Sequence, residues 1–279
     1  MKPQTVIPCR SGCVLFAALA LAGTSTISVA LETKPKPPAS SQPSADLPEA
    51  STIIARYIEA IGGKDALLKT VSRHIRGTYS VPDQGMEASL EMFRSIPNKL
   101  LIRIYIPDVG EITQGFDGQV GFMNSPMQGA SILEGNRLRQ IGETADFYTE
   151  LHRAEKFTSM ETVELTEFQG KPCYKVKLMS KAGREYAEFF DPQTGLLAGN
   201  VGKQEIPGGT VEQITVYSDY KRFGDLLLPT RTVVRVMNFE QVMTYELIEF
   251  NTVDEKVYEL PEEVKALVKP KPSTQPDGN

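Results

Sequence analysis

Two histidines, His74 and His152, are the side chains best suited to acid–base chemistry, because imidazole titrates near neutral pH. Neither belongs to a catalytic motif: the sequence contains no His-Glu-x-x-His, no Gly-x-Ser-x-Gly, no glycine-rich phosphate loop and no Cys-x-x-Cys. His74, beside Arg73, is predicted to be a surface residue. His152 falls near the C-terminus of a predicted helix, where the helix dipole favours an imidazolium. We therefore predict no enzymatic activity and name no catalytic residue; carboxylates brought together by the fold are the alternative chemistry.

Cysteine content and charge exclude further classes of site. Cys9 and Cys13 lie in the N-terminal leader, and Cys173 is predicted to pack as a small hydrophobic side chain at the start of a strand. A metal cluster cannot be formed from this small number of thiols and imidazoles. Neither a metal nor a cofactor is therefore predicted. Removing Lys2 and Arg10 with the leader leaves 28 basic against 35 acidic residues, a net charge of −7 that repels phosphate backbones. Nucleic acid is therefore not predicted as a partner.

Residues 1–30 have the organisation of a signal peptide. Lys2 and Arg10 precede the apolar run Val14–Ala22, and Ser28-Val29-Ala30 matches a small-x-small cleavage site. Thr24 stands where a lipoprotein would carry its acylated cysteine, so no lipid attachment is predicted. Cleavage after Ala30 predicts a periplasmic protein. A retained membrane anchor is the alternative, because the segment is uncharged and long enough to span a bilayer.

Two proline-rich segments flank one predicted domain. Residues 31–48 hold five prolines among Ser, Lys and Ala, a composition that favours extended, solvated chain, and they are predicted to be a linker. Residues 269–279 have a similar composition and are predicted to be a disordered tail. The domain between them is predicted to cover residues 49–268.

Helical periodicity opens the domain and returns within it. Apolar residues repeat at helical spacing between Ile53 and Ile61, after the possible cap Ser51, and Gly62-Gly63 supplies a stop. A long helix is predicted for Leu133–Phe157, where an apolar stripe lies opposite charged residues. The members of that stripe are Leu138, Ile141, Ala145, Tyr148 and Leu151.

Alternation of apolar and polar residues with a period of two dominates the rest of the domain. It is clear in residues 86–93 and 100–106, and Asp117-Gly118 is a hairpin signal between two further runs. More runs follow between residues 161 and 250, separated by turn residues. Their spacing of roughly 8 to 12 residues favours an antiparallel meander of about ten strands, in an α+β protein that is mainly β.

The inward side of such a sheet needs a cover. Its predicted residues include Val176, Leu178, Val234 and Leu247. With two or three helices against about ten strands, either the sheet curls around a filled core or space remains beneath the helices as an apolar pocket. Composition alone favours the filled core, since most interior Leu and Ile are structural.

Several short patterns occur in an order that is similar to a known family. They are Phe93-Arg94-Ser95-Ile96-Pro97-Asn98, Asp117–Phe122 with Asn124 and Pro126, the helical stretch Leu133–Phe157, and Leu260-Pro261. This order resembles the LolA-like carriers that sort outer-membrane lipoproteins. The resemblance implies an open antiparallel half-barrel wrapped around helices that form a lid over an apolar cavity. In the carriers a basic residue precedes the proline and holds the lid; here Ile96 takes that position, with Arg94 two residues earlier.

The resemblance implies binding without covalent chemistry, in an exported carrier or sensor that holds acyl chains. The expected ligand-binding residues are Ile102, Ile104, Ile106, Leu138, Ile141 and Tyr148 as cavity lining, with Arg94 near the mouth. The expected partner is a lipid or an acylated protein, with transient membrane contact. The alternative is an interaction module with a filled cavity that binds another envelope protein.

Overall fold

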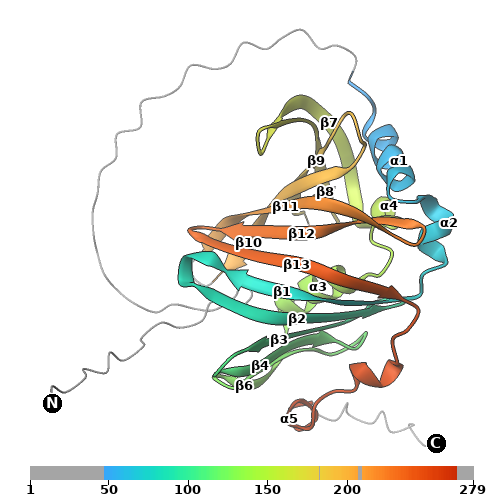
Figure 1. The fold of residues 1–279 in the computed structure, drawn as a ribbon. Coiled ribbons are helices and arrows are strands. Elements are labelled where there is room, and N and C mark those ends of the chain that lie inside the picture. The colour runs from blue at the N-terminus through green and yellow to red at the C-terminus, as the bar shows by residue number, and fades with distance from the viewer. Residues whose placement is uncertain (1–46, 182, 207–208, 269–279) are drawn as a thin grey trace, which may run out of the picture.

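A single antiparallel sheet of thirteen strands organises the computed structural model, which describes residues 47–181, 183–206 and 209–268 (Figure 1). The predicted signal peptide, the tail and all but two residues of the linker lie outside the described residues. The strands are β1 (Ser72–Val81), β2 (Met86–Ser95), β3 (Lys99–Ile106), β4 (Gly110–Phe116), β5 (Gly121–Ser125), β6 (Gly129–Leu133), β7 (Phe157–Phe168), β8 (Lys171–Ser180), β9 (Glu185–Phe190), β10 (Leu197–Ile206), β11 (Gly209–Phe223), β12 (Leu226–Val236) and β13 (Phe239–Phe250).

The strand order shows that two meanders meet in the middle of the sheet. It runs β6-β5-β4-β3-β2-β1-β13-β12-β11-β10-β9-β8-β7, so every neighbouring pair is consecutive in sequence except β1 and β13. The chain starts at the centre, proceeds to the β6 edge, crosses to the β7 edge and returns. The mainly β, open antiparallel fold is confirmed, but the predicted strand count was too low. The sequence pattern predicts no strand at β6, because its Gly-Ala-Ser start lacks the β-branched and aromatic residues typical of strands.

Five α-helices and two 3-10 turns accompany the sheet in the described ranges. They are α1 (Ala50–Ala60), α2 (Gly63–Leu68), α3 (Gly135–Ala145), α4 (Arg153–Lys156), α5 (Glu262–Lys265), η1 (Pro82–Gln84) and η2 (Glu255–Tyr258). The helix α1 ends at Ala60, just before the predicted stop Gly62-Gly63, but Ser51 lies inside it and Glu49 occupies the N-cap position. Gly62 has φ 126°, a conformation that glycine adopts without strain.

The long helix predicted for Leu133–Phe157 is wrong, because the chain forms two helices there. Leu133 ends β6 and Phe157 begins β7. The break comes at Asp146, which has φ −53° and ψ 112°, and not at Gly142, which lies within α3. The Asp146 side chain accepts hydrogen bonds from residues that follow it, and such local bonding by Asp competes with helix continuation.

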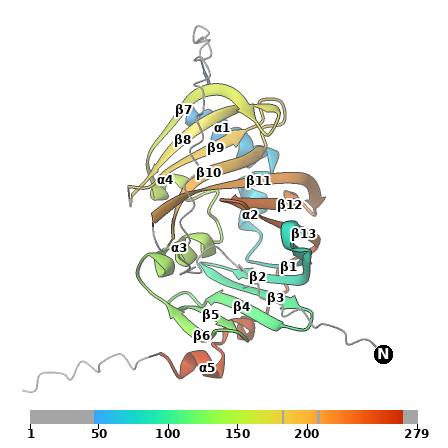
Figure 2. The ribbon, with the colours of Figure 1, turned by 90° about the vertical axis from the view of Figure 1, so that its left-hand side faces the viewer.

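The helices α3 and α4 lie on the concave side of the curved sheet (Figure 2). Ile141 and Ala145 of α3 pack into a buried cluster with β1 to β4, and α1 and α2 pack into a second cluster with β8 to β12. On the convex side, Tyr258 of η2 and Val264 of α5 cover Phe93, Leu101 and Phe122. The C-terminal segment thus closes one part of the outer face, and α3 and α4 cover part of the inner one.

Candidate functional site

A cavity of about 660 Å³ lies between the concave face of the sheet and the helices α3 and α4. Its size falls within the roughly 300–1,000 Å³ range of small-molecule sites. It is lined by residues from almost every element, from Tyr57 of α1 to Ile248 of β13. The space predicted beneath residues 133–157 is therefore present, beside two packed clusters of buried residues, so the core favoured by composition fills only part of the interior.

The cavity wall has an apolar side and a mixed side of apolar and polar residues. Leu100, Ile102, Met123, Leu133 and Ile141 form the apolar side on β3, β5, β6 and α3. On the mixed side, among apolar lining residues of β10 to β13 such as Leu197, Val234 and Met243, lie the polar residues Asn200, Gln213, Thr215, Thr232 and Gln241. The last three are buried. The prediction of an apolar cavity thus describes one side of the wall, and the whole cavity suits an amphipathic occupant.

A buried ion pair stands on the wall between α4 and β9. Nη1 of Arg153 lies 2.5 Å from Oε2 of Glu188, and the two side chains are only 9% and 13% exposed. Burial would lower the pKa of Arg153, but the charge and hydrogen bond of Glu188 outweigh it and raise that pKa. Tyr57, whose pKa is raised by burial, lies beneath the Arg153 guanidinium. The pair therefore fixes the start of α4 against strand β9.

Arg94 fastens the lid segment, which we define as residues 135–156. Its Nη2 donates hydrogen bonds to the carbonyl oxygens of Thr144 and Asp146, at 2.8 and 2.9 Å. These carbonyls end α3. The backbone N–H of Phe147 also donates to the carbonyl of Pro97, at 3.1 Å. Arg94 thus contacts the lid from the strand position two residues before Ile96.

Asp146 ties the two halves of the lid segment together. Its carboxylate lies 2.6 Å from Nζ of Lys156 and 2.9 Å from Nδ1 of His152. Burial would raise the pKa of Asp146, but these hydrogen bonds and charges outweigh it and hold the pKa below its usual range. His152 therefore serves as a structural partner of this carboxylate.

Asp146→Asn is expected to weaken the protein only where the carboxylate is ionised. Because the folded pKa is lowered, the carboxylate contributes stability above the unfolded value of about 3.9, and this contribution is lost as pH falls through the folded pKa. We expect a loss of about 1–2 kcal/mol in the free energy of unfolding near neutral pH. Urea unfolding near neutrality and at about pH 3 checks this. An equal loss at both pH values would contradict the assignment.

The structure brings three of the seven predicted ligand-binding residues to the cavity wall: Arg94, Ile102 and Ile141. Ile104 and Ile106 lie in the packed cluster beneath α3, with Leu138 against its edge. Tyr148 is half-buried and donates a hydrogen bond to the carbonyl of Thr70 at 3.0 Å. Ligand binding by these residues stays a prediction.

The sequence reasoning missed several charged wall residues, among them Arg73, Glu150, Arg153 and Glu188. The position of Arg73 could have been predicted, because it lies two residues before the buried Ile75 on β1 and its side chain is therefore on the same face of the sheet. The other three come from a loop, a one-turn helix and a strand with weak alternation. Only the fold brings them together.

The remaining candidates for chemistry have structural partners. Nε2 of His74 lies 2.8 Å from Glu91, and its ring stacks on Phe93 at 4.5 Å on the convex side. Cys173 is fully buried, as predicted, and burial raises the pKa of its thiol to about 11. Across residues 47–181, 183–206 and 209–268, no group of three or more His, Cys, Asp or Glu could hold a metal ion. No helix in these ranges is long and apolar enough to cross a membrane.

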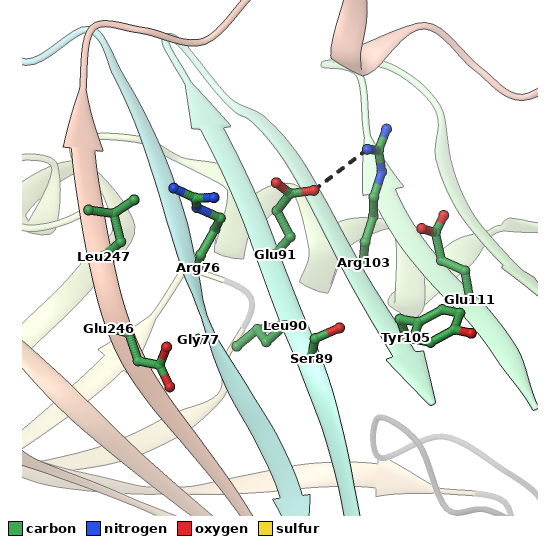
Figure 3. Close-up of a pocket in the computed structure, with 10 residues that line it drawn as sticks. All are labelled: Arg76, Gly77, Ser89, Leu90, Glu91, Arg103, Tyr105, Glu111, Glu246 and Leu247. Carbon is green, nitrogen blue, oxygen red and sulfur yellow. Dashed lines mark ion pairs between the residues drawn. The ribbon is translucent and has the colours of Figure 1, made fainter. Parts of the chain in front are cut away.

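A second, open hollow of about 450 Å³ lies on the convex face over β13, β1, β2, β3 and β4 (Figure 3). Its charged side chains have both signs, with Arg103 paired to Glu91 at 3.7 Å. Leu247, predicted to face inward, lines this outer hollow instead. The reason is a β-bulge at Arg76 and Gly77, which inserts Glu246 into β13 and shifts the alternation by one residue.

Solved structures share this fold at low sequence identity. The chain is similar to a LolA superfamily protein from Nitrosomonas europaea, with a TM-score of 0.51 and 10% identity over 76% of this chain and 98% of the other. A DUF1329 family protein from Desulfovibrio piger has a TM-score of 0.54 and 10% sequence identity, over 75% of this chain and 97% of the other. A domain from Vibrio parahaemolyticus, designated an outer membrane lipoprotein-sorting protein, has a TM-score of 0.52 and 10% sequence identity, over 75% of this chain and 97% of the other. No protein-family model and no curated protein matches the chain. The chain therefore has the fold of the LolA superfamily.

Proposed function

We propose that this protein is a non-enzymatic carrier or sensor of the bacterial periplasm that binds a lipid or an acylated protein in its concave cavity. The observation that carries the proposal is the ligand-sized cavity beneath a helical lid, in a LolA-like fold. The signal peptide predicted for residues 1–30 supports the periplasmic location. The expected partners are acyl chains, with transient membrane contact during loading and release.

The apolar side of the wall supplies the driving force for such binding. Burying a methylene group contributes about 0.8 kcal/mol, so ten methylenes against Leu100, Ile102 and Ile141 contribute about 8 kcal/mol before the costs of binding. Because the costs of binding are subtracted from this gross amount, a chain of this length is expected to bind more weakly than the micromolar affinity to which about 8 kcal/mol corresponds. The lid contacts of Arg94 would have to open for entry, because they hold α3 over the sheet.

Val234→Trp is expected to block the cavity, because Val234 lines it and an indole fills part of its volume. The full chain should be exported to the periplasm of a bacterial host, purified without detergent and extracted for lipid mass spectrometry. We expect bound lipid in the wild-type protein and at least about tenfold less in the variant.

Tyr105→Trp is the matched control. Tyr105 is 55% exposed on the convex face, so this substitution introduces the same indole ring outside the cavity. It is expected to keep its lipid. Wild-type protein that carries no lipid, or a Val234→Trp variant that carries as much as Tyr105→Trp, would refute the proposed function.

A further inference from the structure

Two arginines face each other across neighbouring strands inside the cavity. Arg73 of β1 and Arg94 of β2 are direct partners in the antiparallel register, and both line the cavity. Like charges directly opposite each other destabilise a sheet. Burial, followed by the charge of Arg94, lowers the pKa of Arg73 to about 10, so the Arg73 guanidinium remains charged at neutral pH.

The protein compensates these charges only in part. Arg94 donates to two backbone carbonyls, and Arg73 lies over the rings of Phe147 and Phe250, at 5.8 and 5.7 Å. Within the described part of the chain, neither guanidinium has a carboxylate within 4.0 Å, and the Nε atoms of both are buried without a hydrogen-bond partner. Arg153, on the same wall, shows the contrast, since Glu188 pairs with it at 2.5 Å.

The chemistry that would complete this pair is an anion. A guanidinium presents a planar fork of N–H donors that matches a carboxylate or a phosphate, and a buried cation without a counter-charge is costly. The apolar surface begins beside the pair: Ile75 and Met92 lie one step further along the same strand faces, and Leu100 is the β3 partner of Arg94. An anionic group held there would direct an attached hydrocarbon chain along the apolar side.

We propose that Arg73 and Arg94 form a subsite for the anionic group, carboxylate or phosphate, of an amphipathic ligand whose hydrocarbon chain occupies the apolar side of the cavity. This inference rests on the proposed function and adds the class of ligand. A cavity with this subsite prefers ligands with an anionic group, whereas a cavity without it would accept any acyl chain.

The test compares ligands that share one chain and differ in the head group. Dodecanoate, dodecyl phosphate and uncharged dodecanol are titrated into the full chain by calorimetry, below the concentrations at which they aggregate. We expect at least one anion to bind about 10- to 100-fold more tightly than dodecanol, as expected for a desolvated, charge-assisted contact. The tighter of the two anions identifies carboxylate or phosphate as the preferred group, and inorganic phosphate alone is expected to bind weakly.

Arg73→Gln removes one charge and leaves the contacts of Arg94 with the lid in place. Arg76→Gln is the matched control, because Arg76 is an exposed residue of the same strand that lines the convex hollow. We expect Arg73→Gln to remove most of the preference for the anion and Arg76→Gln to retain it. The preference measured on wild-type protein tests the inference even if Arg73→Gln does not fold.

The outcomes separate this inference from the proposed function. Equal binding of dodecanol and both anions to wild-type protein overturns the anion subsite and leaves acyl binding intact. Equal loss of the preference in Arg73→Gln and Arg76→Gln also overturns it. Failure of all three amphiphiles to bind counts against acyl binding itself.

Discussion

Glu188→Ala is expected to lower the free energy of unfolding by about 3–5 kcal/mol, because it leaves the guanidinium of Arg153 buried without its counter-charge. Arg153 is 8% exposed, and its Nε already lacks a hydrogen-bond partner among the described residues. The nearby carboxylate of Glu150 contributes a smaller favourable charge than Glu188 does, so it cannot replace it. Urea unfolding near neutral pH measures the loss.

Two further variants test this explanation. The double variant Arg153→Met with Glu188→Leu removes both charges and keeps apolar volume, so it is expected to be more stable than Glu188→Ala alone. Glu164→Ala breaks the pair with Lys175, whose N–O distance is 2.9 Å but whose side chains are 49% and 28% exposed. That surface change is expected to cost less than about 1 kcal/mol. Similar losses for Glu188→Ala and Glu164→Ala would show that burial does not determine the cost.

Local patterns were enough to predict much of the sheet. The alternation in β2 and β3 placed Ile102 and Ile104 on the inner face, where both are buried. The Asp117-Gly118 hairpin forms as expected, with the Asp117 carboxylate accepting hydrogen bonds from the N–H groups of Gln119 and Val120. Such features depend on residues close in sequence, and one sequence contains that information.

The failures of prediction involve contacts between distant segments or departures from regular geometry. The apolar stripe from Leu138 to Leu151 fits one long helix, and only the carboxylate of Asp146, with its partners His152 and Lys156, explains the break. The bulge opposite Gly77 reverses the side on which Leu247 lies. Neither feature changes the local periodicity enough to be recognised.

The candidate site was predictable only where it follows the local periodicity of a strand or, for Ile141, of a helix. Ile102 and Arg94 reach the cavity wall because their strands place them there, whereas Glu188 and Arg153 meet only when β9 and α4 come together. Strands β10 to β13 contribute the mixed side of the cavity, where polar residues such as Thr215, Thr232 and Gln241 lie among apolar ones. The amphipathic character of the cavity is thus a property of the assembled sheet.

Gly77→Ala is expected to lower the free energy of unfolding by more than about 3 kcal/mol, because it forces backbone strain at the centre of the sheet. A Cβ atom at Gly77 would lie 1.8 Å from the carbonyl oxygen of Thr244 and 2.9 Å from its carbonyl carbon. Both are backbone atoms, so no side-chain rotation relieves the clash. Figure 3 shows Gly77 between Glu246 and Leu90, at the bulge that pairs β1 with β13.

Gly142→Ala is the matched control for this prediction. Gly142 lies within α3, and a Cβ atom there would meet only the ring of Phe116, at an ordinary 3.6 Å. Since alanine favours helix over glycine by up to about 1 kcal/mol, this variant is expected to be as stable as the wild type or more stable. Urea unfolding of both variants measures the contrast, and a Gly77→Ala protein with wild-type stability would contradict the bulge. The pair β1–β13 joins the first and last strands of the domain, so a clash at Gly77 acts on the contact that unites the two meanders into one concave surface.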